Sequence, residues 1–362
     1  MTVREEIDLL IERGYYEEAL SKVHRLKDPL DQIEVLTDVA VAIHDRGGPD
    51  EWIPSIMEDA VYLAKKLKDP SNRAAAYARI ASSLARVGYE EDAMYYFNRA
   101  IDETDDIESP IEKGVVLSTL AYHLALAGYP ENSFELFNIA FDTIIGAEMD
   151  YKVKVDGIVR IGELLEKAGD ALPSSKALQF YKMAFDIFDK LHVNQRAAVV
   201  EKKIELAQTV YDVGLPAIRQ ALLEGRNHYA IALIEKKYTG VARLIGELEV
   251  ALWMKRVNNI EYLDVVEKAF QHCENPRFTE ANVQKIATLL TELGSLKKAL
   301  EFATAIRDVR KKSDAMKAIA IELAMRRQFD EAREIIKDIP DPRVKTDALT
   351  EVVAIEEASE GR

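Results

Sequence analysis

Apolar residues recur at intervals of three and four along most of the chain, the spacing that places them on one face of an α-helix. The stretch 77–101 shows the pattern in its simplest form. Its first half carries apolar residues at Tyr77, Ile80, Ala81, Leu84 and Val87, and its second half carries them at Ala93, Phe97 and Ala100. Gly88 lies between the halves, where a helix commonly ends in a left-handed residue. The pattern predicts two amphipathic helices joined by a tight turn.

This helical hairpin recurs at a nearly constant interval. Helix starts in which Asp or Ser precedes Pro are at Pro29, Pro70 and Pro110, 41 and 40 residues apart, and Asp150-Tyr151 lies where the next start is due. Asp and Ser cap helices, and Pro fits the first helical position. Glycines at the expected turns are Gly48, Gly88, Gly128 and Gly169. A fixed period of this size predicts stacked hairpins rather than one globular core.

No segment alternates with a two-residue period for long enough to predict a sheet, so the fold class is all-α. Each unit also resembles the tetratricopeptide repeat, a hairpin with small and large apolar residues at fixed positions. In the unit after 77–101, these positions are Leu117, Leu120, Ala121, Leu124, Gly128, Ser133, Phe137 and Ala140. The resemblance covers about two-thirds of the chain and implies a right-handed α-solenoid of stacked antiparallel hairpins. The N-terminal period of 40–41 residues is longer than the family's 34.

The repeat pattern divides the chain into three predicted segments. Residues 1–193 form N-terminal repeats, 194–275 form a helical middle that fits the repeat poorly, and 276–362 form C-terminal repeats that end in a lone helix near 342–358. The aromatic residues of the middle could supply an apolar patch for a homodimer. These residues are Tyr229, Tyr238, Trp253 and Tyr262.

Charge is distributed unevenly between these segments. The 362 residues contain 48 Lys and Arg and 63 Asp and Glu, for a net charge of −15. Residues 1–150 hold 14 of the basic and 30 of the acidic residues, a net charge of −16, so the rest of the chain is nearly neutral. Such asymmetry concerns partners and solubility rather than fold. It indicates a basic partner for the N-terminal repeats.

Composition adds three expectations. Charged residues make up 31% of the chain, against 10 Asn and 8 Gln, which is typical of thermophile proteins. The single cysteine, Cys273, excludes a disulfide framework within one chain. The charged N-terminus and the short uncharged runs favour a cytoplasmic protein without a membrane span.

The usual sequence motifs of catalysis are missing. The chain has no P-loop, dinucleotide-binding glycine loop, nucleophile elbow, His-Glu-x-x-His or Cys-x-x-Cys. His123 is interpreted as a packing or groove-lining residue rather than a ligand. The adjacent His272 and Cys273 lack a third partner and are interpreted as a helix end before Asn275-Pro276. We therefore predict no catalytic residue, no cofactor and no metal site.

Two charged clusters are candidate binding sites. The acidic cluster consists of Asp102, Glu103, Asp105, Asp106, Glu108 and Glu112. It is interpreted first as a solvated loop, second as a docking patch for a basic protein and third as a metal site, for which the glycine and spacing of a calcium loop are missing. The basic cluster consists of Arg307, Arg310, Lys311 and Lys312. It could contact RNA phosphates, but interleaved acids favour ion pairs within helices.

The tetratricopeptide resemblance implies a concave groove lined by the first helix of each hairpin. By register, this groove includes Ser82, Ser118, Tyr122, Glu163 and Glu166, and its glutamates favour a cationic ligand. We therefore expect a non-catalytic protein–protein interaction scaffold for a basic partner, of which a ribosomal protein is an example. The alternative is a regulatory protein that senses a ligand or peptide in the groove.

Overall fold

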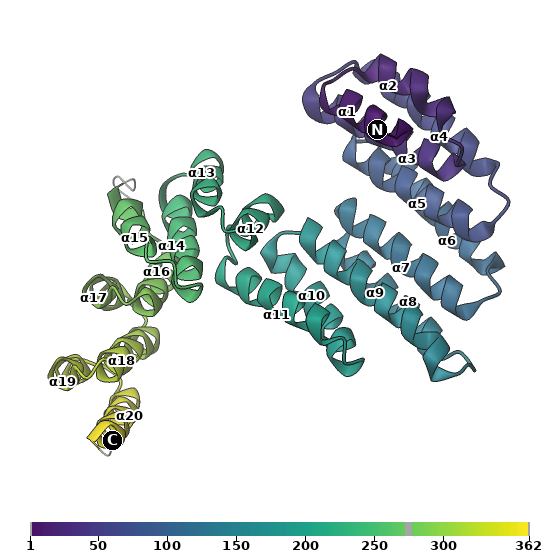
Figure 1. Ribbon diagram of the computed structural model, residues 1–362. Coiled ribbons are helices and arrows are strands. Elements are labelled where there is room, and N and C mark those ends of the chain that lie inside the picture. Colours follow the sequence, from purple (N-terminus) through teal and green to yellow (C-terminus); the bar gives the residue numbers. More distant parts are fainter. Residues whose placement is uncertain (1, 272–276, 361–362) are drawn as a thin grey trace. The chain divides into compact units, whose positions relative to one another are not determined.

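The computed structural model describes residues 2–271 and 277–360 of the chain. These residues form twenty α-helices and three short 3-10 helices, and they contain no strand. Consecutive helices pack side by side in pairs (Figure 1). The all-α prediction is confirmed.

The helices divide between two compact units, Met1–Ile204 and Glu205–Arg362, with the boundary inside α11. The first unit contains α1 Val3–Glu12, α2 Tyr16–Lys22, α3 Pro29–Arg46, α4 Ile53–Lys65, α5 Pro70–Arg86, α6 Glu90–Glu103, α7 Pro110–Leu126, α8 Pro130–Ile145, α9 Tyr151–Ala171, α10 Ser174–Lys190 and most of α11 Asn194–Thr209. The second contains α12 Pro216–Leu223, α13 Asn227–Lys237, α14 Gly240–Arg256, α15 Tyr262–Gln271, α16 Glu280–Leu293, α17 Leu296–Ala305, α18 Val309–Met325, α19 Phe329–Lys337 and α20 Pro342–Glu360. The division of the sequence into three segments stays a prediction.

The predicted helix starts are confirmed by their capping bonds. The carboxylate of Asp28 accepts a hydrogen bond from the backbone N–H of Leu30 at 2.9 Å, and that of Asp69 accepts one from Ser71 at 3.0 Å. The hydroxyl of Ser109 accepts one from the backbone N–H of Glu112 at 3.3 Å. In all three cases Pro occupies the next position. These local bonds explain why the helices begin where the sequence indicates.

The predicted turn glycines are partly correct. Gly88 and Gly128 adopt left-handed conformations with φ of 89° and 88°, as expected. At the first turn, Gly47 rather than Gly48 is the left-handed residue, with φ of 70°. The interpretation of Gly169 as a turn residue was wrong, because it lies inside α9. There the missing side chain makes room for the ring of Tyr181 on α10.

Each hairpin of the first unit contributes to two layers. The first helices α3, α5, α7 and α9 pack on one another in series and form a continuous layer, which we call the first-helix layer. The second helices α2, α4, α6, α8 and α10 pack mainly on the first helices, and contacts between successive second helices are sparse among the described residues. Small side chains such as Ala81 and Ala93, both fully buried, allow the close approach within a hairpin. Because successive second helices make few contacts with one another, the second-helix layer is open between its members.

Arg327 provides the first prediction from the fold. It occupies the turn between α18 and α19, where several other hairpins have glycine, and it is left-handed with φ of 63°. A left-handed conformation costs a residue with a side chain about 1 kcal/mol. We therefore expect Arg327→Gly to raise the free energy of unfolding by roughly 1 kcal/mol in denaturant titrations. An unchanged or lower free energy of unfolding would contradict the conclusion that the left-handed conformation of Arg327 costs stability.

Candidate interaction surfaces

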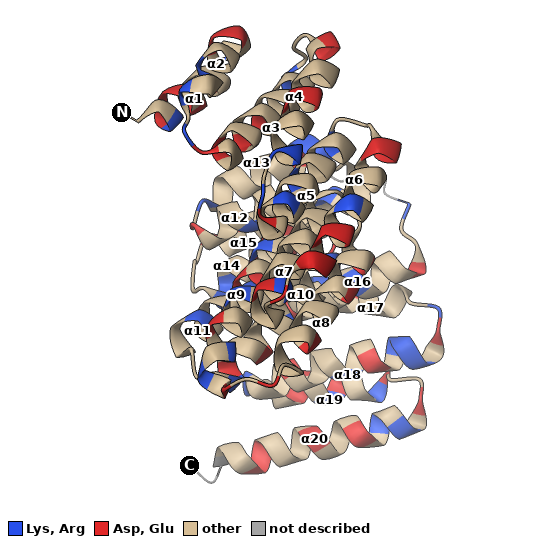
Figure 2. Cartoon of the chain, turned by 90° about the vertical axis from the view of Figure 1, so that its right-hand side faces the viewer, with Lys and Arg blue, Asp and Glu red and all other residues tan. Residues whose placement is uncertain are grey.

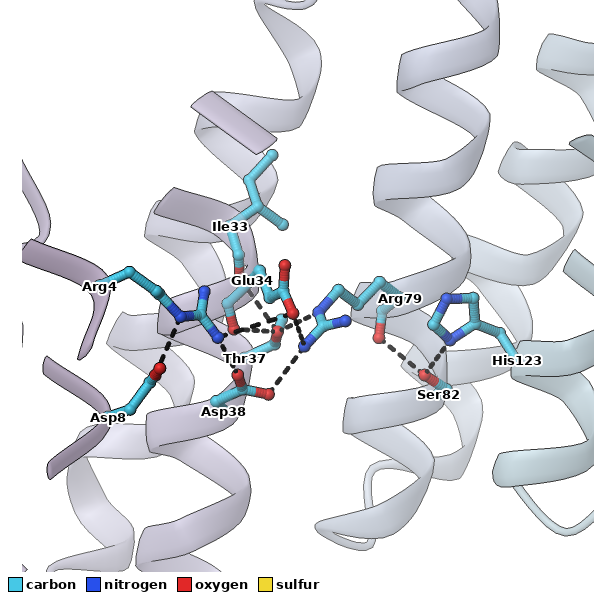
Figure 3. A network of polar contacts seen from close by, with 9 residues as sticks. All are labelled: Arg4, Asp8, Ile33, Glu34, Thr37, Asp38, Arg79, Ser82 and His123. Atoms are coloured by element: carbon cyan, nitrogen blue, oxygen red, sulfur yellow. Dashed lines mark hydrogen bonds and ion pairs between the residues drawn. The ribbon is translucent and has the colours of Figure 1, made fainter. Parts of the chain in front are cut away.

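A chain of polar contacts joins neighbouring members of the first-helix layer (Figure 3). Asp38 on α3 lies between two arginines. One carboxylate oxygen accepts a hydrogen bond from Arg4 on α1 at 3.0 Å, and the other accepts one from Arg79 on α5 at 2.8 Å. The guanidinium of Arg79 also donates to the hydroxyl of Thr37 at 3.0 Å. Asp38 therefore links α1, α3 and α5.

Ser82 and His123 continue this network between α5 and α7. The Ser82 Oγ lies 2.9 Å from His123 Nδ1 and 2.9 Å from the carbonyl oxygen of Arg79. Burial, followed by the charge of Arg79, lowers the pKa of His123 to about 3. At neutral pH the imidazole is uncharged and far too weak a base to activate a hydroxyl efficiently. The pair is a packing contact, one of the two roles expected for His123.

Several contacts of this layer join residues separated by the period that the sequence predicts. The pairs Asp38–Arg79, Asp45–Arg86, Ser71–Glu112 and Ser82–His123 are each separated by 41 residues. Equivalent positions of adjacent hairpins lie side by side when hairpins stack in register. Complementary polar residues spaced by one period were therefore the signal in the sequence that could have identified these pairs.

A pocket of about 260 Å³ opens on this layer between α3, α5 and α7. The charged residues that line it are Asp38, Asp45, Arg46, Arg79 and Arg86. Each has a partner within the protein: Arg79 pairs with Asp38, Arg86 pairs with Asp45, and Arg46 donates to the carbonyl oxygens of Ile11 and Glu12 at 2.8 Å. Four of these five charges are therefore in ion pairs, whereas the guanidinium of Arg46 bonds to carbonyl oxygens and has no carboxylate partner among the described residues.

The predicted groove glutamates on α9 already have cationic partners from α11. Glu163 binds Arg196 at 2.8 Å, and Glu166 binds Lys203 at 2.7 Å. Although burial works to raise it, the two arginines beside Glu163, Arg196 and Arg160, hold the pKa of its carboxyl below the ordinary value. The chain's own side chains thus take the place expected for a cationic ligand.

The other predicted groove residues differ in exposure. Ser118 is fully buried and donates to the carbonyl oxygen of Val115 at 2.7 Å. Ser82 and Glu166 are also buried, whereas Tyr122 and Glu163 are partly exposed. Since helical register fixes only the approximate face, it did not show which of these side chains a neighbouring helix covers. Ligand binding at this face stays a prediction.

Some residues of the acidic cluster bind other side chains of the protein, and the others are exposed. Glu103 pairs with Arg73 at 2.7 Å, Asp105 pairs with Lys113 at 3.0 Å, and Glu112 accepts a hydrogen bond from Ser71 at 2.6 Å. The remaining members are exposed and take part in no ion pair among the described residues; they are Asp102, Asp106 and Glu108. Across the part of the chain that the structure describes, no group of His, Cys, Asp and Glu could hold a metal ion.

The basic cluster surrounds the start of α18. Arg307, Arg310 and Lys311 are exposed, and Lys312 donates to the carbonyl oxygen of Thr304 at 2.7 Å. Both α18 and α20 carry basic residues near their starts and acidic residues further on (Figure 2), and Lys317 pairs with Glu351 between these helices. RNA contact by the cluster stays a prediction. The other C-terminal candidates, His272 and Cys273, lie outside the described residues.

The second unit contains a buried charged group that the sequence analysis missed. Glu249 on α14 is fully buried and lies 2.9 Å from Nζ of Lys285 on α16. It also accepts a hydrogen bond from the backbone N–H of Asp212 at 3.1 Å. Burial raises the pKa of Glu249 to about 7, although Lys285 acts to lower it. For Lys285, burial works to lower the pKa, but Glu249 and Asp212 raise it above the ordinary value.

The aromatic residues of the predicted dimer patch do not share one environment. Trp253 is only 1% exposed and belongs to the core of the second unit, so its inclusion in a surface patch was wrong. Tyr238 and Tyr262 pack partly against the same core, whereas Tyr229 is 51% exposed. A homodimer stays a prediction.

Grooves lie between members of the open second-helix layer. Their volumes are about 480 Å³ between α2 and α4, 450 Å³ between α4 and α6, and 720 Å³ between α8 and α10. Exposed aromatic rings border them, including Tyr62 at 57% and Tyr151 at 59% exposure. The sequence analysis missed these grooves, although aromatic residues outside the buried stripe, such as Tyr62 on α4 and Tyr95 on α6, were a signal.

The architecture defines the chain as an all-α protein built from packed helical pairs. Its sequence is 70% identical to Ton1535 from Thermococcus onnurineus NA1, a protein of known crystal structure. The match covers 97% of this chain and 99% of that chain with a TM-score of 0.94. The chain therefore belongs to the same family as Ton1535. Because this relative comes from a thermophilic archaeon, it agrees with the thermophile composition.

Other comparisons add little. A circular tandem repeat protein with novel repeat topology is 11% identical over 99% of this chain and 78% of that chain, but its TM-score of 0.21 carries no argument about fold. No family model and no curated protein matches the sequence. The tetratricopeptide resemblance and the handedness of the solenoid thus stay predictions. No helix within the described residues combines the length and apolar character needed to cross a bilayer.

Proposed function

We propose that this protein is a non-catalytic protein–protein interaction scaffold whose acidic N-terminal repeats bind a basic protein. The observation that carries the proposal is the way residues 1–150 use their 14 cations, which face 30 Asp and Glu in the same segment. Arg4, Arg73, Arg79 and Arg86 each pair with a carboxylate of their own or a neighbouring hairpin. Cations engaged in this way cannot neutralise the remaining surface.

Many carboxylates of the same repeats have no such partner. Exposed acids that take part in no ion pair among the described residues include Glu17, Glu18, Glu58, Asp59, Glu90 and Glu91. A surface with this excess of negative charge attracts cationic partners over a distance of about 10 Å at moderate ionic strength. Ribosomal proteins are one class of basic partner of this kind, and the exposed members of the basic cluster at α18 would contact RNA in the same particle.

Two features weaken the competing functions. The pKa of His123, about 3, makes the Ser82–His123 pair a poor general base for catalysis. In the pocket of the first-helix layer, four of the five lining charges are in ion pairs, which leaves only Arg46 for a charged ligand and gives little support to a ligand-sensing regulator. Both features leave protein binding as the best-supported proposal.

Affinity capture with the full chain tests this proposal. The immobilised protein is incubated with lysate of its native cells at 50 and 500 mM salt, and bound proteins are identified by mass spectrometry. We expect enrichment of basic proteins at low salt and their release at high salt. The control bait carries Glu17, Glu18, Glu90 and Glu91 as glutamine, which removes exposed charge without breaking an internal ion pair, and we expect it to capture less. Recovery of proteins with the charge distribution of the whole lysate would refute the proposal.

A further inference from the structure

Helix α4 separates two of the grooves of the second-helix layer. The groove toward α6 is lined by apolar side chains that include Met57 and Val61 of α4 and Tyr96 of α6. The groove toward α2 contains Ile56 and Leu63 of α4 on its near side. Tyr62 borders both grooves. Helix α4 therefore presents apolar surface on both flanks, which we call the α4 surface.

The charged residues of the α4 surface are mostly acidic. The carboxylates that line its grooves are Glu51, Glu58, Asp59 and Asp92, and the only Lys or Arg among the described lining residues is Lys65. The groove between α8 and α10 is different, because Asp142 and Asp186 are matched there by Lys182 and Lys190. Apolar grooves with an acidic rim are thus a property of the α4 surface and not of the second-helix layer in general.

Packing of the core does not explain these features, although Nζ of Lys66 lies 3.9 Å from the centroid of the Tyr62 ring. Acidic residues in the first turn of a helix are favoured by its dipole, which suits Asp92 at the start of α6. Glu58 and Asp59 lie in the middle of α4, where the dipole offers no such gain. Tyr62 keeps 57% of its surface exposed, and its hydroxyl accepts a hydrogen bond from Lys66. Neither the two acids nor the exposed ring contributes to the core.

We propose that the α4 surface docks an amphipathic helix of the basic partner. The inference rests on the proposed function and names where and how the partner binds. Helix α4 has 13 residues and is about 20 Å long, which matches a helix of three to four turns. Apolar residues of the docked helix, spaced by three, four and seven, enter the groove between α4 and α6 beside Tyr62 and Tyr96. Its Lys and Arg residues face Glu58, Asp59 and Asp92.

The test uses a defined probe and the full chain. The probe is a fluorescein-labelled 15-residue amphipathic peptide of leucine and lysine, and its binding is followed by fluorescence polarisation at several salt concentrations. Two comparison peptides separate the contribution of charge from that of apolar contact. One replaces lysine by glutamate, and the other replaces leucine by serine. We expect the leucine–lysine peptide to bind at least tenfold more tightly than either.

Matched variants locate the binding site. Glu58→Lys with Asp59→Lys reverses two exposed charges at the α4 surface, and Asp142→Lys with Asp186→Lys reverses two exposed charges at the groove between α8 and α10. We expect the first pair to weaken binding more than tenfold and the second, which changes the net charge equally, to weaken it less than threefold. Tyr62→Ala should weaken binding about fivefold and leave the salt dependence unchanged. Thermal unfolding of each variant confirms that it is folded.

The outcomes distinguish the two proposals. Equal weakening by both charge reversals, or no effect of Tyr62→Ala, would overturn the assignment of the α4 surface and leave the scaffold proposal standing. Tight binding of the leucine–glutamate peptide would overturn the basic character of the docked helix. If the native chain binds no lysine-containing peptide at any salt concentration and captures no basic protein, the scaffold proposal itself fails.

Discussion

Replacing Lys285 by methionine is expected to destabilise the second unit by about 2 kcal/mol at pH 8 and by less than about 1 kcal/mol at pH 5. The substitution leaves the fully buried carboxylate of Glu249 without its cation. Removal of one partner from a buried ion pair costs about 3–5 kcal/mol, because the other charge stays buried and uncompensated. We expect a smaller loss than this range at pH 8, because Glu249 can take up a proton, which limits the extra loss to about 1.4 kcal/mol for each pH unit above its pKa of about 7. The side chain of Lys285 is also 33% exposed, so water can enter.

The pH dependence follows from the raised pKa of Glu249. Its folded value of about 7 exceeds the ordinary 4.5, so the folded state binds the proton more tightly than the unfolded state. The contribution of Glu249 to stability is thus complete below about pH 4.5 and is lost as the pH rises toward 7, by roughly 3 kcal/mol in total. Without Lys285 the pKa rises further, and the loss continues above pH 7. At pH 5 the carboxyl of Glu249 is mostly neutral in the folded state, so the loss of the Lys285 cation has little effect on stability.

Denaturant titrations at the two pH values check this expectation. Trp253 is buried on α14, the helix that carries Glu249, and its emission reports the second unit once Trp52 is replaced by phenylalanine. Adding Glu249→Gln to Lys285→Met should restore most of the stability at pH 8, because the amide oxygen can still accept the hydrogen bond from Asp212. A loss of equal size at pH 5 and pH 8 would show that Lys285 acts through packing and not through charge.

Gly169→Val is expected to lower the free energy of unfolding of the first unit by about 3 kcal/mol. A Cβ atom at Gly169 would lie 2.5 Å from Cε1 and 2.7 Å from Cδ1 of the Tyr181 ring. This ring is 2% exposed, and its hydroxyl donates a hydrogen bond to Asp170 at 2.8 Å, so it cannot move aside without breaking other contacts. Forcing extra methyl groups into a packed interface costs about 1–3 kcal/mol, and valine adds a branched Cβ.

Two controls separate crowding from backbone effects. In a Tyr181→Leu background the ring is gone, and Gly169→Val should cost at least 1 kcal/mol less than in the native chain. Gly128→Ala tests the opposite case, since a Cβ there meets no atom within 4 Å but φ is 88°. We expect a loss of about 1 kcal/mol from the left-handed backbone alone. Equal effects of Gly169→Val in both backgrounds, measured by circular dichroism during denaturation, would rule out the contact with Tyr181.

The two kinds of glycine illustrate why only part of the structure could be predicted. One kind of glycine adopts a left-handed turn, and the other makes room for a neighbouring helix. In the sequence both are glycine, and both recur at the same interval. The local sequence does not tell these two kinds of glycine apart, because the need for space at Gly169 arises from Tyr181 on another helix. The same applies to Glu163, Glu166 and their cations from α11, whose pairing depends on how two hairpins stack.

The sequence by itself determined the all-α class, the helical hairpin and the capped helix starts. These features arise from the spacing of apolar residues and from bonds between residues only two to four positions apart, as at Asp28 and Asp69. Only the tertiary structure decided which polar groups are paired, that Glu249 is buried, and that the grooves beside α4 are open. Those properties depend on distances between helices far apart in the chain, and a one-dimensional pattern of residues does not contain them.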